Sequence, residues 1–125
     1  MEDKVMFKVI VAGCRNFNDY DFLEKKLDNI LQRVSGEICI VSGKADGADA
    51  LGERYALRKG YCIEGYPAEW ALHGKAAGPI RNEKMAQNAD ALVAFWDGKS
   101  RGTKNMIETA KKYGLKIRII NINEA

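Results

Sequence analysis

The fold is decided by the stretch Met-Phe-Lys-Val-Ile-Val-Ala at residues 6–12, a nearly continuous apolar run that ends at Gly13. A short run of this kind is typical of a strand that is covered on both faces, as in a parallel sheet. Four further runs predict strands in the same way, at residues 38–41, 61–66, 91–96 and 116–121.

Helical patterns lie between these runs. We expect helices over residues 19–34 and 48–59, a third that begins at Pro79 and ends near residue 89, and a fourth, capped by Thr103, that ends at residue 113. The stretch from 67 to 79 is predicted to be irregular. Because strands and helices alternate throughout, we expect an α/β fold, a Rossmann-like three-layer αβα sandwich with a mostly parallel five-stranded sheet. The length of 125 residues fits a single domain over residues 1–125.

The composition of the chain limits the kinds of ligand and partner that we expect. Apolar residues make up 46% and charged residues 30%, as in globular proteins, and the net charge of +3 suits an anionic small molecule better than nucleic acid. The acidic start has no long apolar region, so we expect no signal peptide, no membrane partner and a cytoplasmic location. The three cysteines form no C-x-x-C pair, so we expect no metal site, and Cys39 and Cys62 lie in apolar runs and are expected to be buried.

The loops after the strands are the place to look for a site, because ligands of such sheets bind outside the carboxyl ends of the strands. The first of these loops contains Gly13, Cys14 and Arg15. The glycine allows close approach of a ligand to the backbone, and Arg15 can hold a phosphate or a carboxylate. A tight turn with a solvated Arg15 is the alternative. Cys14 is more readily explained as a small spacer than as a nucleophile.

The second loop supplies the candidate ligand-binding residues Ser42, Gly43, Lys44, Gly47 and Asp49. Two glycines between a strand and a helix leave backbone N–H groups at the positive end of the helix, which favours an anion. Capping of the following helix is the alternative role for Asp46 or Asp49, and for Asp46 we expect capping rather than ligand contact.

The third loop adds the candidates Lys75, Gly78, Arg81 and Asn82. With a helix that begins at Pro79, Arg81 and Asn82 fall in its first turn, where the helix dipole disfavours a cation unless an anion is bound nearby. In the alternative, Arg81 is solvated or pairs with Glu83 or Asp97. The single histidine, His73, has no identified partner and is not assigned a role.

The fourth loop follows the most apolar strand and contributes Asp97, Gly98, Ser100, Gly102 and Thr103. Its glycines open the backbone and its hydroxyls lie where the last helix is predicted to begin, so it is a further candidate anion site. Four such loops at one edge of a sheet predict a shared site for phosphate and ribose groups.

These strings together resemble a known family. The residues that carry the resemblance are Gly13-Cys14-Arg15, Ser42-Gly43-Lys44-Ala45-Asp46-Gly47-Ala48-Asp49, Gly74-Lys75-Ala76-Ala77-Gly78-Pro79-Ile80-Arg81-Asn82 and Gly98-Lys99-Ser100-Arg101-Gly102-Thr103. They are similar to the YspA, YpsA-related branch of the SLOG superfamily over nearly the whole chain. The resemblance implies a Rossmann-like domain that binds nucleotides or nucleotide-derived signals.

The superfamily also includes phosphoribohydrolases of the LONELY GUY type, and this distant resemblance implies a place for Arg81 in a hydrolase site. Arg81-Asn82-Glu83-Lys84-Met85 is similar to the arginine motif of those enzymes. Their second motif places a glutamate three residues after a threonine, whereas Met106 stands at that distance from Thr103. Without that carboxylate an oxocarbenium-like transition state loses its stabiliser, so the hydrolase activity is not expected to transfer.

The expected function is therefore binding of a nucleotide or an ADP-ribose-like derivative, as a sensor or binding module without a further cofactor. Trp70 either stacks on a base or packs as a lid on the third helix. The alternative is a nucleotide hydrolase with Arg81 and Asp97 as catalytic candidates, and with Asp49 or Glu69 as other possible bases. Nucleic-acid binding is the third hypothesis and is not favoured by the modest charge. A homodimer is compatible with the sequence, although no surface in it is diagnostic.

Overall fold

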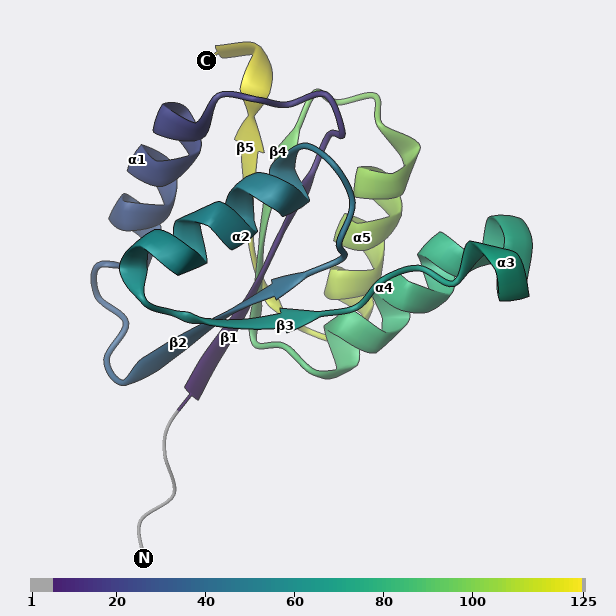
Figure 1. Cartoon of the computed structure of the whole chain (residues 1–125), viewed down its shortest axis with the longest axis horizontal. Coiled ribbons are helices and arrows are strands. Elements are labelled where there is room, and N and C mark those ends of the chain that lie inside the picture. The colour runs from purple at the N-terminus through teal and green to yellow at the C-terminus, as the bar shows by residue number, and fades with distance from the viewer. Residues whose placement is uncertain (1–5, 125) are drawn as a thin grey trace, which may run out of the picture.

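The computed structural model describes residues 6–124 and contains a five-stranded sheet between two layers of helices (Figure 1). The strands are β1 (Met6–Gly13), β2 (Glu37–Ser42), β3 (Cys62–Gly65), β4 (Ala91–Trp96) and β5 (Lys116–Asn121). Their order in the sheet is β3-β2-β1-β4-β5, and every neighbouring pair is parallel. The expected α/β fold is confirmed. The first five residues, on which part of the signal-peptide expectation rests, lie outside the described residues.

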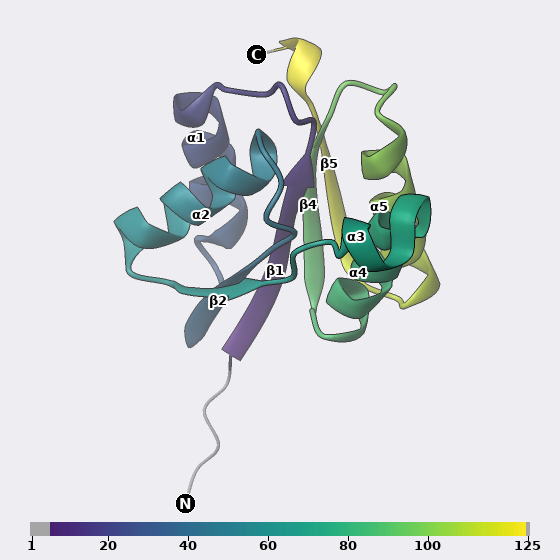
Figure 2. The same ribbon diagram turned by 45° about the vertical axis from the view of Figure 1, so that its right-hand side comes forward.

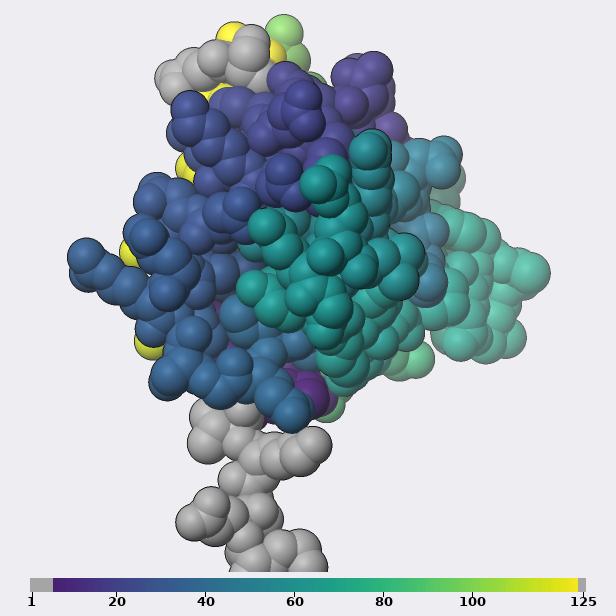
Figure 3. All heavy atoms as spheres, turned by 60° about the vertical axis from the view of Figure 1, so that its left-hand side comes forward, coloured from purple at the N-terminus to yellow at the C-terminus, as the bar shows by residue number. Residues whose placement is uncertain are grey.

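The helices divide between the two faces of the sheet (Figure 2). One face is covered by α1 (Tyr20–Leu31) and α2 (Ala48–Lys59), whose outer surfaces make up much of the view in Figure 3. The other is covered by α4 (Ala77–Gln87) and α5 (Arg101–Lys112). None of the helices in the described part of the chain is long and apolar enough to cross a membrane.

Alternation along β1 explains why two layers are needed. Val9 and Val11 belong to the core beneath α1 and α2, whereas Ile10 and Ala12 belong to the core beneath α4 and α5. All four are buried. Successive side chains of a strand point to opposite faces, so an apolar run of this length requires cover on both sides.

The strand order places a topological switch point between β1 and β4. The chain leaves β1 toward α1 on one face and leaves β4 toward α5 on the other, so the two loops diverge at the carboxyl ends of adjacent strands. Open α/β sheets bind their ligands at such a divergence.

The segment between β3 and α4 differs from the prediction of an irregular stretch. It forms the short helix α3 (Trp70–His73) and the 3-10 turn η1 (Gly74–Ala76), which runs directly into α4. The third long helix therefore begins at Ala77 and not at Pro79. Its N-cap residue, Ala76, makes no side-chain hydrogen bond, and Ala77 instead donates its backbone N–H to the carbonyl of Gly74, so no polar cap marks this start in the sequence.

Two predicted helix caps are wrong. The cap of α5 is Ser100, whose hydroxyl accepts the backbone N–H of Thr103, so Thr103 lies inside the first turn. The cap of α2 is Gly47, and no side chain, including that of Asp46, bonds to this helix end as a cap. In addition, Cys62 is exposed and only Cys39 is buried, because β3 is an edge strand.

Candidate functional site

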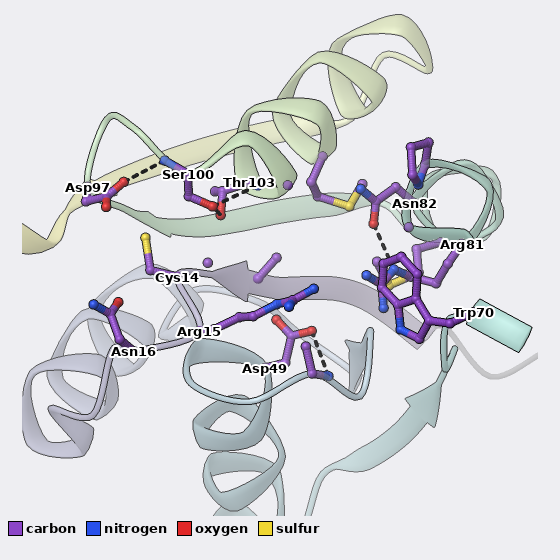
Figure 4. A pocket seen from close by; sticks show the side chains of 18 residues that line it. Cys14, Arg15, Asn16, Asp49, Trp70, Arg81, Asn82, Asp97, Ser100 and Thr103 are labelled. Atoms are coloured by element: carbon purple, nitrogen blue, oxygen red, sulfur yellow. Dashed lines mark hydrogen bonds between the residues drawn. The ribbon is translucent and has the colours of Figure 1, made fainter. Parts of the chain in front are cut away.

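A cleft of about 430 Å³ opens at the switch point between β1 and β4 (Figure 4). It gathers side chains from the loops after β1, β2 and β4 and from the start of α4. The predicted site residues that line it are Gly13, Cys14, Arg15, Asp49, Gly78, Arg81, Asn82, Asp97, Ser100, Gly102 and Thr103. Arg15, Arg81 and Gly102, which come from three separate segments, thus share one cleft.

Other predicted site residues do not line this cleft. Ser42 is buried and donates its hydroxyl to Glu53, and the ammonium of Lys44 pairs with the same carboxylate at 2.9 Å. Lys75 is exposed on η1 and Gly98 is exposed in the turn after β4. Gly43 and Gly47 act through the backbone, Gly43 behind Arg81 and Gly47 against the loop after β1.

Arg81 is held in place by two hydrogen bonds. Its Nη1 donates to the carbonyl of Gly43, and its Nε donates to Asn82 Oδ1 at 2.9 Å. Asn82 in turn donates to Asn105 of α5 at 2.8 Å. Burial lowers the pKa of Arg81, while the nearby Asp49 acts in the opposite direction. The guanidinium is therefore fixed at the wall of the cleft before any ligand arrives.

The structure corrects two expectations about Arg81. It is the fifth residue of α4, so it lies in the second turn and the helix dipole no longer argues for an anion beside it. Its expected alternative partners are engaged elsewhere. Glu83 accepts hydrogen bonds from Lys112 and Tyr113, and Asp97 accepts the backbone N–H groups of Lys99 and Ser100.

Gly43 brings Arg81 and Asp49 together. A Cβ on Gly43 would lie 2.6 Å from Arg81 Nη1 and 2.8 Å from Asp49 Oδ2, so both charged groups pack directly on its backbone. A larger residue at this position would have to displace one of them. Gly43 thus allows the Asp49 carboxyl group and the Arg81 guanidinium to lie side by side in the cleft wall.

Asp49 is a buried carboxyl group that faces this cleft. Burial raises its pKa from 3.8 to about 6, against the N–H of Ala45 and the charges of Arg81 and Arg15, which favour the ionised form. Glu53, one turn further along α2, adds to the increase. Ala45 donates its N–H to Asp49 Oδ2 at 3.3 Å. A carboxyl with a pKa near neutrality can exchange a proton under ordinary conditions.

Replacing Asp49 by asparagine is expected to change how stability depends on pH. The pKa of Asp49 is higher in the folded chain than its ordinary value, so the folded state binds the extra proton between about pH 4 and pH 6 and loses stability as the pH rises through that range. Relative to Asp49→Asn, the wild type should therefore lose up to ~3 kcal/mol of unfolding free energy between pH 4 and pH 7. Urea unfolding at both pH values measures this.

The control is Asp46→Asn, which removes an exposed carboxylate from the same loop. It is expected to change the unfolding free energy by less than ~0.5 kcal/mol at either pH. A constant difference between wild type and Asp49→Asn across the range would contradict the assignment of a buried, proton-binding carboxyl.

The first turn of α5 forms the opposite wall. Ser100 Oγ lies 3.0 Å from Thr103 Oγ1 and occupies the N–H of Thr103. Arg101 and Gly102 are the first two residues of α5, so their N–H groups have no acceptor within the helix. They lie at the positive end of its dipole. Beside them Asp97 folds the turn by accepting two N–H groups at 2.8 Å each, which lowers its pKa. Asp97 is therefore better suited to shaping the loop than to accepting a proton.

Cys14 lies between these two walls and is buried. Burial is the main reason why its pKa is raised, and this disfavours the thiolate that a nucleophile needs. The geometry favours the interpretation of Cys14 as a small spacer.

Trp70 closes the outer end of the cleft. Its ring lies 6.0 Å from the Arg15 guanidinium, within the range of a cation–π contact, and its Cη2 would be 3.4 Å from a Cβ on Gly78. The ring is half exposed. Trp70 thus packs on the third long helix, as one of the two alternatives expected, while one side of it remains open to a ligand.

Besides Trp70, six lining residues were not among the predicted set: Ala12, Asn16, Ala45, Pro79, Met85 and Met106. The two methionines belong to the buried stripes of α4 and α5. Their helical spacing places them in the core, and only the position of the cleft above that core makes them part of the site.

The model of the YspA, cpYpsA-related SLOG family matches residues 7–73, which include the loops after β1 and β2 and extend through α3. The chain belongs to this family. It is also 34% identical to the Gene 61 protein of Mycobacterium phage D29 over 125 residues, which covers 95% of this chain and 98% of the phage protein.

Solved structures share the fold of this SLOG-family protein. DNA processing protein A of Streptococcus pneumoniae has a TM-score of 0.69 at 21% identity, covering 91% of this chain and 50% of its own. The same protein of Helicobacter pylori, described by its single-stranded DNA binding mode, gives 0.66 at 20%, covering 90% and 64%. TM1055 gives 0.65 at 21%, covering 90% and 72%. The SLOG-family chain thus spans about half to two-thirds of the two DNA processing proteins.

Proposed function

We propose that this protein is a binding module for a nucleotide or a nucleotide-derived ligand, and that the cleft between β1 and β4 holds its phosphate. The observation that carries the proposal is the convergence of Arg15 and Arg81 on the same cleft as the first turn of α5. Two guanidinium groups and free helix N–H groups are the donors that phosphate oxygens accept.

The remaining lining favours a ligand larger than inorganic phosphate. A cleft of about 430 Å³ lies within the range of small-molecule sites, which is roughly 300–1,000 Å³. Trp70 offers an open aromatic surface at its outer end, where a base could stack. Asp49 offers a carboxylate oxygen within the same cleft for a ribose hydroxyl.

The test compares ligands that differ only in phosphate. At a concentration of 100 times Kd, AMP or ADP-ribose should stabilise the protein by ~2.7 kcal/mol and raise Tm by roughly 5–10 °C. Adenosine, which has the same base and ribose, should bind at least ~100 times more weakly in calorimetry. Equal binding of adenosine and AMP would contradict a phosphate site. The absence of any shift across millimolar nucleotides would refute the function.

A single-stranded oligonucleotide belongs in the same panel, because one structural neighbour is described by its mode of binding single-stranded DNA. Tight binding of the oligonucleotide with no binding of mononucleotides would replace the proposal with a nucleic-acid function. The slope of the logarithm of the binding constant against the logarithm of the salt concentration would then report how many phosphates are neutralised.

One observation favours a second candidate, cleavage of a nucleotide N-glycosidic bond. Asp49 is a buried carboxyl with a pKa of about 6 beside Arg81, which is the pattern of a general acid or base near a phosphate-binding cation. Release of free base from nucleoside monophosphates, lost in Asp49→Asn and retained in Asp97→Asn, would establish it. Without base release from any nucleotide, binding alone remains.

A further inference from the structure

Two cysteines lie side by side on the sheet, away from the cleft. Cys39 of β2 and Cys62 of β3 are register partners in the parallel pair, so their side chains project from the same face of neighbouring strands. Cys39 is fully buried, whereas Cys62 is exposed. Within the described residues, the third cysteine, Cys14, is buried in the cleft beyond the end of β1.

The register suits a covalent bridge. Adjacent strands of a sheet lie roughly 4.8 Å apart, within the ~4.4–6.8 Å that Cα atoms of a disulfide span. β3 has four residues and is at the edge of the sheet, so only β2 restrains it by strand pairing. A small shift of this edge strand that brings the two sulfur atoms to bonding distance would leave the pairing of β1 with β2 and β4 in place and would have to be accommodated by the ion pair between Lys8 of β1 and Glu64 of β3.

We propose that Cys39 and Cys62 are an oxidisable thiol pair that a hydroperoxide converts into a disulfide between β2 and β3. In the first step the Cys62 sulfur attacks the peroxide, the O–O bond breaks, a sulfenic acid forms and the first product leaves as water or an alcohol. In the second step the Cys39 sulfur attacks the sulfenic sulfur, and the hydroxyl leaves with the Cys39 proton as water. The two thiols lose two electrons and the peroxide gains them.

The environments of the two thiols fix this order. Cys62 is the one that an oxidant in solution can reach. Burial is the main reason why the pKa of Cys39 is raised, which disfavours its thiolate, so Cys39 is not the thiol that reacts first with the oxidant. On the other side of Cys39, its register partner on β1 is Lys8, which forms an ion pair of 2.9 Å with Glu64 of β3.

The bridge would fasten the strand that leads to the cleft wall. β3 ends at Gly65, and the chain then continues through residues 66–69 into α3, which begins with Trp70. Oxidation would therefore tie the segment that carries Trp70 to the central part of the sheet. This role concerns a site separate from the proposed phosphate cleft and does not depend on it.

The experiment treats the folded full chain with a small excess of hydrogen peroxide, blocks the remaining thiols and digests with trypsin. The three cysteines fall on separate tryptic peptides, residues 9–15, 34–44 and 60–75. We expect free thiols to fall from three to one per chain, with the peptides 34–44 and 60–75 joined and two hydrogen atoms lost. Dithiothreitol should restore all three.

Matched variants make the outcome decisive. Cys14→Ser should oxidise as the wild type does and end with no free thiol, whereas Cys62→Ser and Cys39→Ser should form no internal bridge. Because Cys62 is exposed, its replacement by serine is not expected to impair folding, which circular dichroism checks. Accumulation of sulfinic or sulfonic acid at Cys62 with Cys39 still free, or a bridge between two chains, would overturn the proposal.

Discussion

Replacing Arg81 by glutamine is expected to weaken the binding of nucleotide phosphate by at least ~100-fold. A fixed guanidinium contributes at least about 2.7 kcal/mol to the binding of a phosphate, and this free energy corresponds to a ratio of ~100 in Kd. Arg81 is held by Gly43 and Asn82, so it needs no reorganisation to meet a phosphate. Arg81→Lys retains the charge without the planar fork and should lose only about tenfold. Calorimetry with AMP measures both.

Two controls separate binding from folding. Lys75→Ala removes a cation from the same segment of sequence, but Lys75 is exposed and outside the cleft. The affinity of this variant for AMP should therefore differ from that of the wild type by less than about twofold. Arg81→Gln combined with Asp49→Asn avoids leaving a buried carboxylate beside an absent partner. If this double variant folds well and binds AMP like the wild type, Arg81 is not a phosphate ligand.

Replacing Gly47 by alanine is expected to destabilise the fold by at least ~3 kcal/mol and to lower Tm by about 10 °C. Gly47 has a φ of 74°, and a Cβ there would lie 2.2 Å from the carbonyl oxygen of Cys14 and 2.4 Å from that of Arg15. Both contacts are with backbone, which cannot rotate away as a side chain would. The loop after β1 would have to move, and the residues of this loop that line the cleft would be displaced.

Gly60 provides the matched control. It has the same φ of 74° at the end of α2, but a Cβ there would meet nothing within 4 Å. Gly60→Ala therefore carries only the backbone cost of a left-handed residue, about 1 kcal/mol. Gly60 has a ψ of 27° in the left-handed helical region, whereas Gly47 has a ψ of −127°, so the difference between the two variants in thermal or urea unfolding combines the clash at Gly47 with its less favourable backbone conformation. Equal losses would show that the loop after β1 is not packed against Gly47.

The layered fold follows from local patterns that could be predicted. Residues 6–12 are apolar at successive positions, and Val9 and Ile10 do face opposite cores. Because the carboxyl ends of parallel strands meet at one edge, the rule also anticipated that the loops with Arg15 and Gly102 would share a cleft. Neither conclusion needed knowledge of distant contacts.

Side-chain direction in the loops could not be predicted in this way. Lys44 and Lys75 had the right chemistry, yet one pairs with Glu53 and the other lies exposed on η1. The short helices α3 and η1 have no cap that the sequence displays. Their position depends on packing, as in the contact of Trp70 with Gly78.

The sequence by itself determined the alternation of strands and helices and the edge of the sheet where glycines and cations gather, because both depend on periodicity and on chain direction. Only the tertiary structure decided that Arg81 stands against Asp49 across Gly43, that Cys62 is exposed beside Cys39, and that Trp70 closes the cleft. These contacts join residues far apart in the chain. Their burial and charge depend on strand order and packing, which no local pattern encodes.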